Sequence, residues 1–318
     1  MKILKIILMS IGFVAICALS IQAVQEGPFT TENEIVSNEV VSKVNPTEDY
    51  NIHALKMPED LNLAGESVPI ENPDIYERMD RELLVNTFWQ SNGLLLIKRA
   101  HKYFPVIEPI LKEYGIPDDF KYLAVIESGL TQAVSPAGAV GFWQIMEGTG
   151  KDYKLEINGN VDERYNIEKS TRVACEYIIA AKKRFGTWTM AAAAYNAGNT
   201  GVLRQLERQE VSNYYDLLLG EETGRYVFRI LALKEIIKNP QKYGFNFGED
   251  QLYKNIPTYT VKVDTSVENF AVFAQKYDIN YKILKLHNPW LREANLSNAK
   301  GKMYRIEIPE KGYYQATK

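Results

Sequence analysis

The sequence predicts a mainly α domain followed by a small α+β module. Apolar residues recur at helical spacing in several segments between residues 74 and 238. Segments 258–263 and 303–308 alternate as strands do, with two short helical patterns between them. A polar, acidic stretch precedes the first helical pattern. We therefore expect four regions: a signal peptide over 1–23, a flexible linker over 24–75, the α domain over 76–250 and a β-α-α-β module over 256–312.

The N-terminus has the pattern of a secretory signal. Lys2 and Lys5 precede an apolar run over residues 6–18, and Ser20-Ile21-Gln22-Ala23 supplies a cleavage site. This pattern predicts export to the periplasm or cell envelope. The run is short for a membrane span. An uncleaved anchor and a lipid attached at Cys17 remain alternatives.

Composition and charge exclude several classes of partner. Removing residues 1–23, which hold two lysines and no acid, changes the net charge from −3 to −5. Since no basic tract stands out, we expect no nucleic-acid partner. Only Cys175 would remain, so no internal disulfide is expected. His53, His101 and His287 lie far apart, and we expect no metal and no other cofactor.

The helices of the α domain are predicted from apolar periodicity and from stop signals such as Gly115-Ile116-Pro117, Gly186 and Asn239-Pro240. The segment between Gly129 and Gly150 is rich in Gly, Ser and Pro and should be mostly loop. The predicted helical segments cover residues 74–115, 118–128, 166–185, 188–195 and 222–238.

A carboxylate occupies a core position in the second of these helices. Phe120, Leu123 and Ala124 form the apolar stripe of helix 118–128, and Glu127 continues it, seven residues after Phe120. Burial there would raise the pKa of the carboxyl group, and so would the negative end of the helix dipole.

Two interpretations of Glu127 follow from the helix alone. A carboxylic acid that keeps its proton near neutral pH is what cleavage of a glycosidic bond requires. The alternative is a buried ion pair with Arg164 or Arg172.

Three segments resemble the motifs of a known family. They are Glu127-Ser128, then Ser135 to Gln144 (SPAGAVGFWQ), then Ala194 to Gly198 (AYNAG). In this order they resemble the soluble lytic transglycosylases of the goose-type lysozyme superfamily, and most of all the membrane-bound lytic transglycosylase D type. The resemblance covers residues 74 to 244 and implies a lysozyme-like fold. The interval from Glu127 to Ser135 is eight residues, one fewer than in the commoner family pattern.

The resemblance implies a role for each matching residue. Glu127 would be the single catalytic acid and then the base. Ser135 would hydrogen-bond the sugar's N-acetyl group or reacting centre, and Gln144 would line the cleft and bind sugar. Tyr195 would steady the intermediate, with Asn196 supporting it.

Structural alternatives remain for these residues. Ser135 would merely begin a turn, Tyr195 would be core, and Asn196 would satisfy backbone groups at a helix end. Phe142 and Trp143 are candidates for stacking on sugar, although we expect one of them to pack in the interior.

Most glycosidases use two carboxylates. The candidates for a second are Glu147, Asp162, Glu163 and Glu176, and none falls at a position that the resemblance marks as catalytic. One acid fits a substrate-assisted route. The acid protonates the bridging oxygen, the N-acetyl oxygen attacks the anomeric carbon, and the 6-hydroxyl closes a 1,6-anhydro ring.

The resemblance therefore implies a peptidoglycan lytic transglycosylase that cleaves the β-1,4 bond between N-acetylmuramic acid and N-acetylglucosamine during cell-wall remodelling. Its partner would be the glycan strands, and it would associate with the cell envelope or membrane surface. A goose-type hydrolase of the same bond and a non-catalytic peptidoglycan-binding protein are the alternatives.

The C-terminal module resembles a degenerate LysM domain. The matching residues are Tyr259 to Val261, Asp264-Thr265, Asn288-Pro289 and Ile306 to Pro309. Val263 replaces the usual glycine. Glycan binding and a purely structural cap are equally open interpretations.

Overall fold

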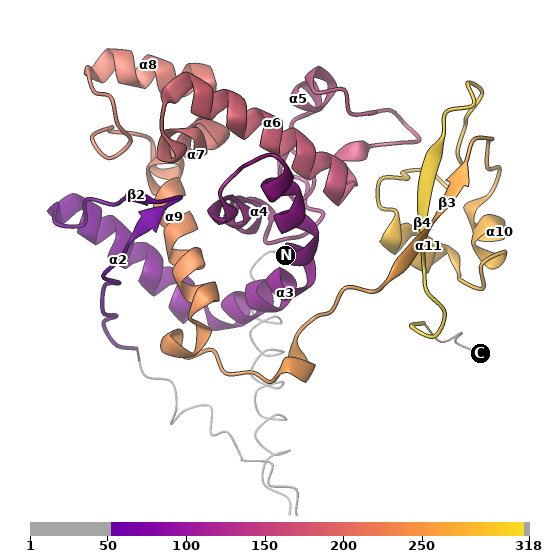
Figure 1. Cartoon of the computed structure of the whole chain (residues 1–318), viewed down its shortest axis with the longest axis horizontal. Coiled ribbons are helices and arrows are strands. Elements are labelled where there is room, and N and C mark those ends of the chain that lie inside the picture. The colour runs from indigo at the N-terminus through magenta and orange to yellow at the C-terminus, as the bar shows by residue number, and fades with distance from the viewer. Residues whose placement is uncertain (1–51, 315–318) are drawn as a thin grey trace, which may run out of the picture. The chain divides into compact units, whose positions relative to one another are not determined.

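The computed structural model describes residues 52–314. The signal peptide predicted over 1–23, and the part of the predicted linker that precedes residue 52, lie outside these residues. The described part is mainly helical and ends in a β-α-α-β module, which confirms the predicted fold class (Figure 1). Within it, no helix is long and apolar enough to cross a membrane.

The helical domain is built around a short central helix, α4 (Lys121–Ser128) (Figure 1). Its residues 121–126 are all buried, and helices α3 and α9 pack against it. The surrounding helices are α2 (Pro73–Phe88), α3 (Gln90–Glu113), α5 (Glu147–Asp152), α6 (Ile167–Phe185), α7 (Trp188–Ala197), α8 (Asn199–Gln209) and α9 (Glu221–Lys238).

Three features of these helices differ from the sequence prediction. The helical stretch that starts near residue 74 is broken at Trp89 into α2 and α3. Helix α5 occupies part of the predicted loop, and α8 was not predicted. Helix α8 contains only three apolar residues, Val202, Leu203 and Leu206, and buries only the first of them.

A small hairpin corrects the predicted linker over 24–75. Strands β1 (Asn62–Leu63) and β2 (Glu66–Ser67) pair, and Leu63 is fully buried in the helical core. The Glu66 carboxylate accepts hydrogen bonds from the backbone N–H groups of Trp188 (2.6 Å) and Thr189 (2.8 Å), at the start of α7. The carboxylate satisfies donors that a helix start leaves free. This stretch is therefore part of the folded domain.

The C-terminal module has the predicted order. Strand β3 (Thr258–Val263) pairs antiparallel with β4 (Tyr304–Pro309), and helices α10 (Phe270–Gln275) and α11 (Tyr281–His287) lie between them in the sequence.

The core of this module continues into the helical domain. Val140, Val161 and Tyr165 belong to the same buried cluster as the module's Trp290 and Leu291. Val161 forms a β-bridge with Leu291. The module therefore packs against residues 140–165, the part of the helical domain that contains Gln144.

Candidate active site

The last turn of α4 places Glu127 where the apolar stripe predicted it. Leu123 and Ala124 are fully buried, and Glu127 is half-buried at the end of the same face. Gly129 then ends the helix in the left-handed conformation, with φ of 60°, which costs glycine no steric strain.

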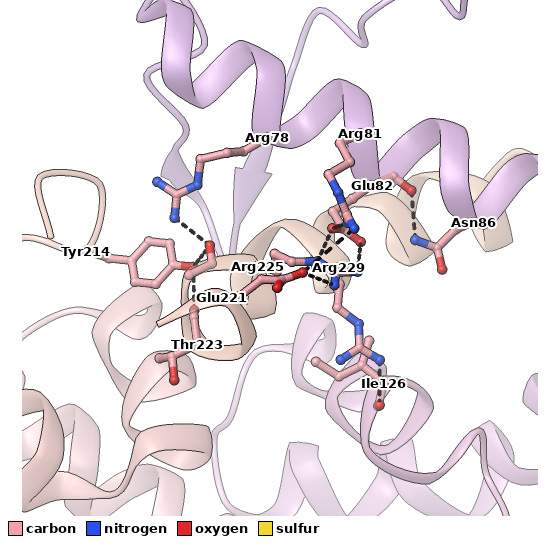
Figure 2. Close-up of polar contacts among 11 residues, drawn as sticks. Arg78, Arg81, Glu82, Asn86, Ile126, Tyr214, Glu221, Thr223, Arg225 and Arg229 are labelled. Carbon is pink, nitrogen blue, oxygen red and sulfur yellow. Dashed lines mark hydrogen bonds and ion pairs between the residues drawn. The ribbon is translucent and has the colours of Figure 1, made fainter. Parts of the chain in front are cut away.

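Helix α9 supplies the groups that face this carboxyl group. The Tyr226 hydroxyl donates a hydrogen bond to Glu127 Oε1. One turn further along α9, the Arg229 guanidinium donates to the carbonyl oxygen of Ile126 at 3.0 Å (Figure 2). Residues three apart share one face of a helix. One face of α9 therefore presents a phenol and a cation to the end of α4.

Burial and the neighbouring polar groups together set the pKa of the Glu127 carboxyl group. Burial raises the pKa of Glu127 to about 7, although the Tyr226 hydrogen bond and the positive charge of Arg229 lower it and the Glu222 carboxylate raises it. Burial also raises the pKa of Tyr226 well above its ordinary value, so this phenol keeps its proton. A carboxyl group with a pKa near 7 can donate a proton and then accept one without a change of pH.

The ion pairs that sequence reasoning considered for Glu127 are not formed. Arg164 pairs with Asp162, with 2.7 Å between Nη2 and Oδ2. Arg172 pairs with Glu113 at 2.6 Å. The group that holds the Glu127 carboxylate is instead the neutral Tyr226.

The loop after α4 is fastened by two side chains of the motifs. The Ser128 hydroxyl donates to the carbonyl oxygen of Phe142 at 2.9 Å. The Gln144 amide donates to the carbonyl oxygens of Ala133 (3.1 Å) and Gly141 (2.8 Å). Gln144 has a φ of 47°, a region that costs a non-glycine residue energy and is found preferentially at functional sites. Its amide therefore braces this loop.

Ser135 forms a turn, which was the structural alternative to its role in binding sugar. Its Oγ accepts the backbone N–H of Ala139 at 3.0 Å, and its carbonyl oxygen accepts the N–H of Gly138 at 2.9 Å. The side chain remains half-buried.

Tyr195 and Asn196, at the end of α7, contact the elements beside Glu127. The Tyr195 hydroxyl donates to the carbonyl oxygen of Trp143 at 2.7 Å. The Asn196 amide accepts a hydrogen bond from Thr223 Oγ1 (2.7 Å) and donates to Glu222 Oε1 (3.1 Å). The AYN segment therefore ties the loop of Trp143 and the start of α9 to one helix end.

Burial corrects the prediction that Phe142 and Trp143 stack on sugar. Trp143 has no exposed surface, and its indole N–H donates to Thr171 Oγ1 at 2.8 Å. Phe142 is 2% exposed, and its ring meets Tyr103 edge-on with 4.7 Å between centroids. Both side chains are held in the interior, where neither presents a ring face to a ligand.

Family models match two segments of the chain. Residues 105–217 match the family described as the transglycosylase SLT domain. The likeness to the SLT family therefore covers part of the helical domain. Residues 259–312 match the soluble lytic transglycosylase C-terminal LysM-like domain, which confirms the second resemblance.

Individual proteins are also similar to this chain. Membrane-bound lytic murein transglycosylase D of Escherichia coli K12 is 31% identical over 247 residues, which are 76% of this chain and 53% of the relative. Membrane-bound lytic murein transglycosylase C of Haemophilus ducreyi is 27% identical over 46% of this chain and 43% of its own length. The chain spans about half the length of these curated relatives. The solved structure of the 70 kDa soluble lytic transglycosylase of Escherichia coli matches 44% of this chain and 24% of its own, with 23% identity and a TM-score of 0.37.

Sequence reasoning missed the contribution of α9 to the site around Glu127. Glu222, Tyr226 and Arg229 are spaced four and three residues apart, so they share one helix face. That polar stripe on a buried helix was the available signal. On an adjacent part of α9, Arg225 pairs with the buried Glu82 of α2 at 2.7 Å (Figure 2).

Among residues 52–314, no group of three or more His, Cys, Asp or Glu side chains is arranged to hold a metal ion.

Proposed function

We propose that this chain is a peptidoglycan lytic transglycosylase whose single acid and base is Glu127. The observation that carries the proposal is the half-buried Glu127 side chain, which accepts a hydrogen bond from the Tyr226 phenol and whose pKa is raised to about 7. The names of two relatives, both lytic murein transglycosylases, support the same substrate class. The bond cleaved is the β-1,4 bond between N-acetylmuramic acid and N-acetylglucosamine.

The reaction begins when protonated Glu127 gives its proton to the bridging oxygen, and the substrate's N-acetyl oxygen attacks the anomeric carbon. The carboxylate that remains is stabilised by the Tyr226 hydrogen bond and by the nearby positive charge of Arg229. It then removes the proton of the 6-hydroxyl, whose oxygen closes the 1,6-anhydro ring. Glu127 ends protonated, as it began, and water is not consumed.

A single acid is supported by the ion pairs of three of the four other candidate carboxylates. Asp162 and Glu163 are buried and pair with Arg164 and Lys169. Glu147 pairs with Lys151 on the surface at 2.5 Å. Each of these carboxylates therefore stabilises the loop or helix in which it lies.

For the remaining motif residues we propose supporting roles. Gln144 and Ser135 shape the loop that forms one wall of the cleft, and their half-buried side chains contact the sugar there. Tyr195 and Asn196 hold that wall and the start of α9 at a fixed separation. Phe142 and Trp143 stabilise the wall from inside.

We further propose that the chain is exported by residues 1–23 and acts in the periplasm or cell envelope, on glycan strands at the membrane surface. The catalytic domain would then comprise residues 61–250, which adds the hairpin to the predicted range, and the LysM-like module residues 256–312.

Mass spectrometry of the soluble products from purified peptidoglycan tests this proposal. We expect muropeptides with 1,6-anhydro ends. Reducing ends would identify a goose-type hydrolase instead, and the absence of soluble product would show that the protein only binds peptidoglycan.

A further inference from the structure

A buried carboxylate joins helix α2 to the first turns of helix α9. The Glu82 side chain of α2 is 1% exposed, and its Oε1 lies 2.7 Å from Nε of Arg225 on α9. Nη1 of Arg81 lies 2.6 Å from the same oxygen. In Figure 2 these side chains lie between the two helices, and Arg229 extends from α9 toward Ile126 of α4. The carboxylate therefore connects α2 to the helix that faces the proposed catalytic acid.

Two further hydrogen bonds hold the same turn of α9. The Arg78 guanidinium of α2 donates to the carbonyl oxygen of Gly224. The Tyr214 hydroxyl donates to the same oxygen at 2.7 Å. Because residues four apart share one face of a helix, Arg78 and Glu82 contact neighbouring residues of α9 from one face of α2.

The polar contacts and the apolar contacts between these helices differ in what they specify. Val227 and Phe228 of α9 are fully buried, but attraction between apolar surfaces has no preferred direction. Hydrogen bonds between charged groups are short and directional. The bond from Arg225 to Glu82 therefore determines where α9 lies along α2 and how it is rotated.

Helix α9 also carries the charged and polar neighbours of the Glu127 carboxyl group. Burial has the largest effect on the pKa of Glu127, and the side chains that shift it further are Tyr226, Arg229 and Glu222. From α7, the neutral Tyr195 phenol lies near the same carboxyl group. Tyr226 directly follows Arg225, so a displacement of this turn would displace the Tyr226 hydroxyl too. A misplacement of about 1 Å can cost about 100-fold in rate.

We propose that Glu82 is a positioning residue for the cleavage at Glu127. Through Arg225 it fixes the rotation and height of α9, and so keeps the Tyr226 hydroxyl against the Glu127 carboxyl group. The inference rests on the proposed function, because it gives Glu82 a part in the reaction of that acid. The residue acts on the reaction only through α9.

The variant that tests this role is Glu82→Gln, which removes the charge and keeps the size of the side chain. The side chains of Arg81 and Arg225 are 46% and 30% exposed, so both keep access to water when their partner is lost. We therefore expect the variant to fold, which circular dichroism checks.

The first test combines Glu82→Gln with Tyr226→Phe. We expect Glu82→Gln alone to lower kcat about 5- to 10-fold with KM unchanged. In a chain that already carries Tyr226→Phe it should cause no further loss, because the two changes remove the same contact. Glu235→Gln removes a carboxylate that pairs with Lys242 near the other end of α9, and this control should keep its kcat. Equal losses with and without Tyr226→Phe, or no loss, would overturn the proposal.

A second test separates position from stability. In the double variant Glu82→Met, Arg225→Met, two apolar side chains replace the ion pair, a change that often leaves stability intact. We expect its urea midpoint to return toward that of the parent protein, while kcat stays as low as in Glu82→Gln. A kcat that recovers together with the midpoint would show that the pair serves stability alone.

A third measurement needs no turnover. The NMR signal of the Glu127 side-chain carboxyl carbon, assigned by its loss in Glu127→Gln, is titrated with pH in the parent protein and in Glu82→Gln. Since the Tyr226 hydrogen bond lowers the pKa of Glu127, we expect a higher midpoint in the variant. An unchanged or lower midpoint would overturn the proposal. A higher midpoint in a protein that releases no soluble product would refute the proposed catalysis and leave the effect of Glu82 on Glu127 established.

Discussion

The Tyr226 hydroxyl on α9 donates a hydrogen bond to the Glu127 carboxylate at the end of α4. Burial favours the protonated form of Glu127, whereas this hydrogen bond favours the charged form. The two effects together leave the acid poised to change its protonation state near pH 7. The pair is thus the structural reason why one carboxyl group can act as acid and then as base.

Replacement of Tyr226 by Phe removes the donor and keeps the ring. Because the hydrogen bond lowers the pKa of Glu127, we expect the alkaline limb of the pH–rate profile to move to higher pH. We also expect kcat to fall about tenfold, since the carboxylate formed after proton transfer loses its partner. Tyr243→Phe, which removes a similar hydrogen bond to Glu235 outside the site, is the control. If the alkaline limb of the Tyr226→Phe profile stays in place or moves to lower pH, Tyr226 does not act through Glu127.

Glu127 also makes stability depend on pH. Its pKa is about 7 in the folded chain, against an ordinary value of 4.5, so the folded protein binds the proton more tightly. The stability that this proton supplies is complete below pH 4.5 and is lost as the pH rises through 7. Glu127→Gln should therefore be more stable than the parent protein at pH 8, by about 3 kcal/mol at most. Urea denaturation at pH 8 and pH 4.5 measures this. If the difference in unfolding free energy between Glu127→Gln and the parent protein is as large at pH 4.5 as at pH 8, the account is contradicted.

The contact between Asn196 and α9 should matter for catalysis more than for binding. Thr223→Val deletes the 2.7 Å hydrogen bond to Asn196, which we expect to cost about 1 kcal/mol of unfolding free energy. Because Tyr226 lies one turn further along α9, kcat should fall while KM stays constant. Thr223→Ser, which keeps the hydroxyl, should restore both kcat and the unfolding free energy. A rise in KM with kcat unchanged would instead indicate that Asn196 contacts the sugar directly.

The C-terminal module should stabilise the helical domain. A chain ended before residue 256 loses the cover over Val161 and Tyr165, which are 0% and 8% exposed. Exposing these two side chains should lower the unfolding free energy of the helical domain by about 2 to 4 kcal/mol. Denaturant titration of the shortened chain beside the full chain measures the difference. Equal midpoints would show that the module folds independently and is free to serve glycan binding alone.

The sequence predicted the part of the site that local patterns determine. The stripe of α4 pointed to Glu127, and the three ordered motif segments pointed to Gln144, Tyr195 and Asn196. It did not predict the contact with Tyr226, because a partner 99 residues away in the chain leaves no local sign of the pairing. The one signal in the sequence was that Tyr226 shares a helix face with Glu222 and Arg229.

Burial explains the two predictions that the structure corrects. Stacking on sugar was inferred from the aromatic character of Phe142 and Trp143, but their exposure depends on the packing of α3 and α6 around them. The linker prediction extended too far because the stretch 24–75 is polar and acidic as a whole and residues 61–68 are too few to show a clear period. Their place in the fold comes from single contacts, such as that of Glu66 with the start of α7.

The rate of cleavage by Glu127→Gln tests the central claim most directly. Release of soluble muropeptides from purified peptidoglycan is measured for the variant and the parent protein at pH 6, with circular dichroism confirming that both are folded. The account predicts a loss of at least about 100-fold, because the amide cannot donate a proton as an acid does. A folded variant that retains a rate within tenfold of the parent would contradict the assignment of Glu127.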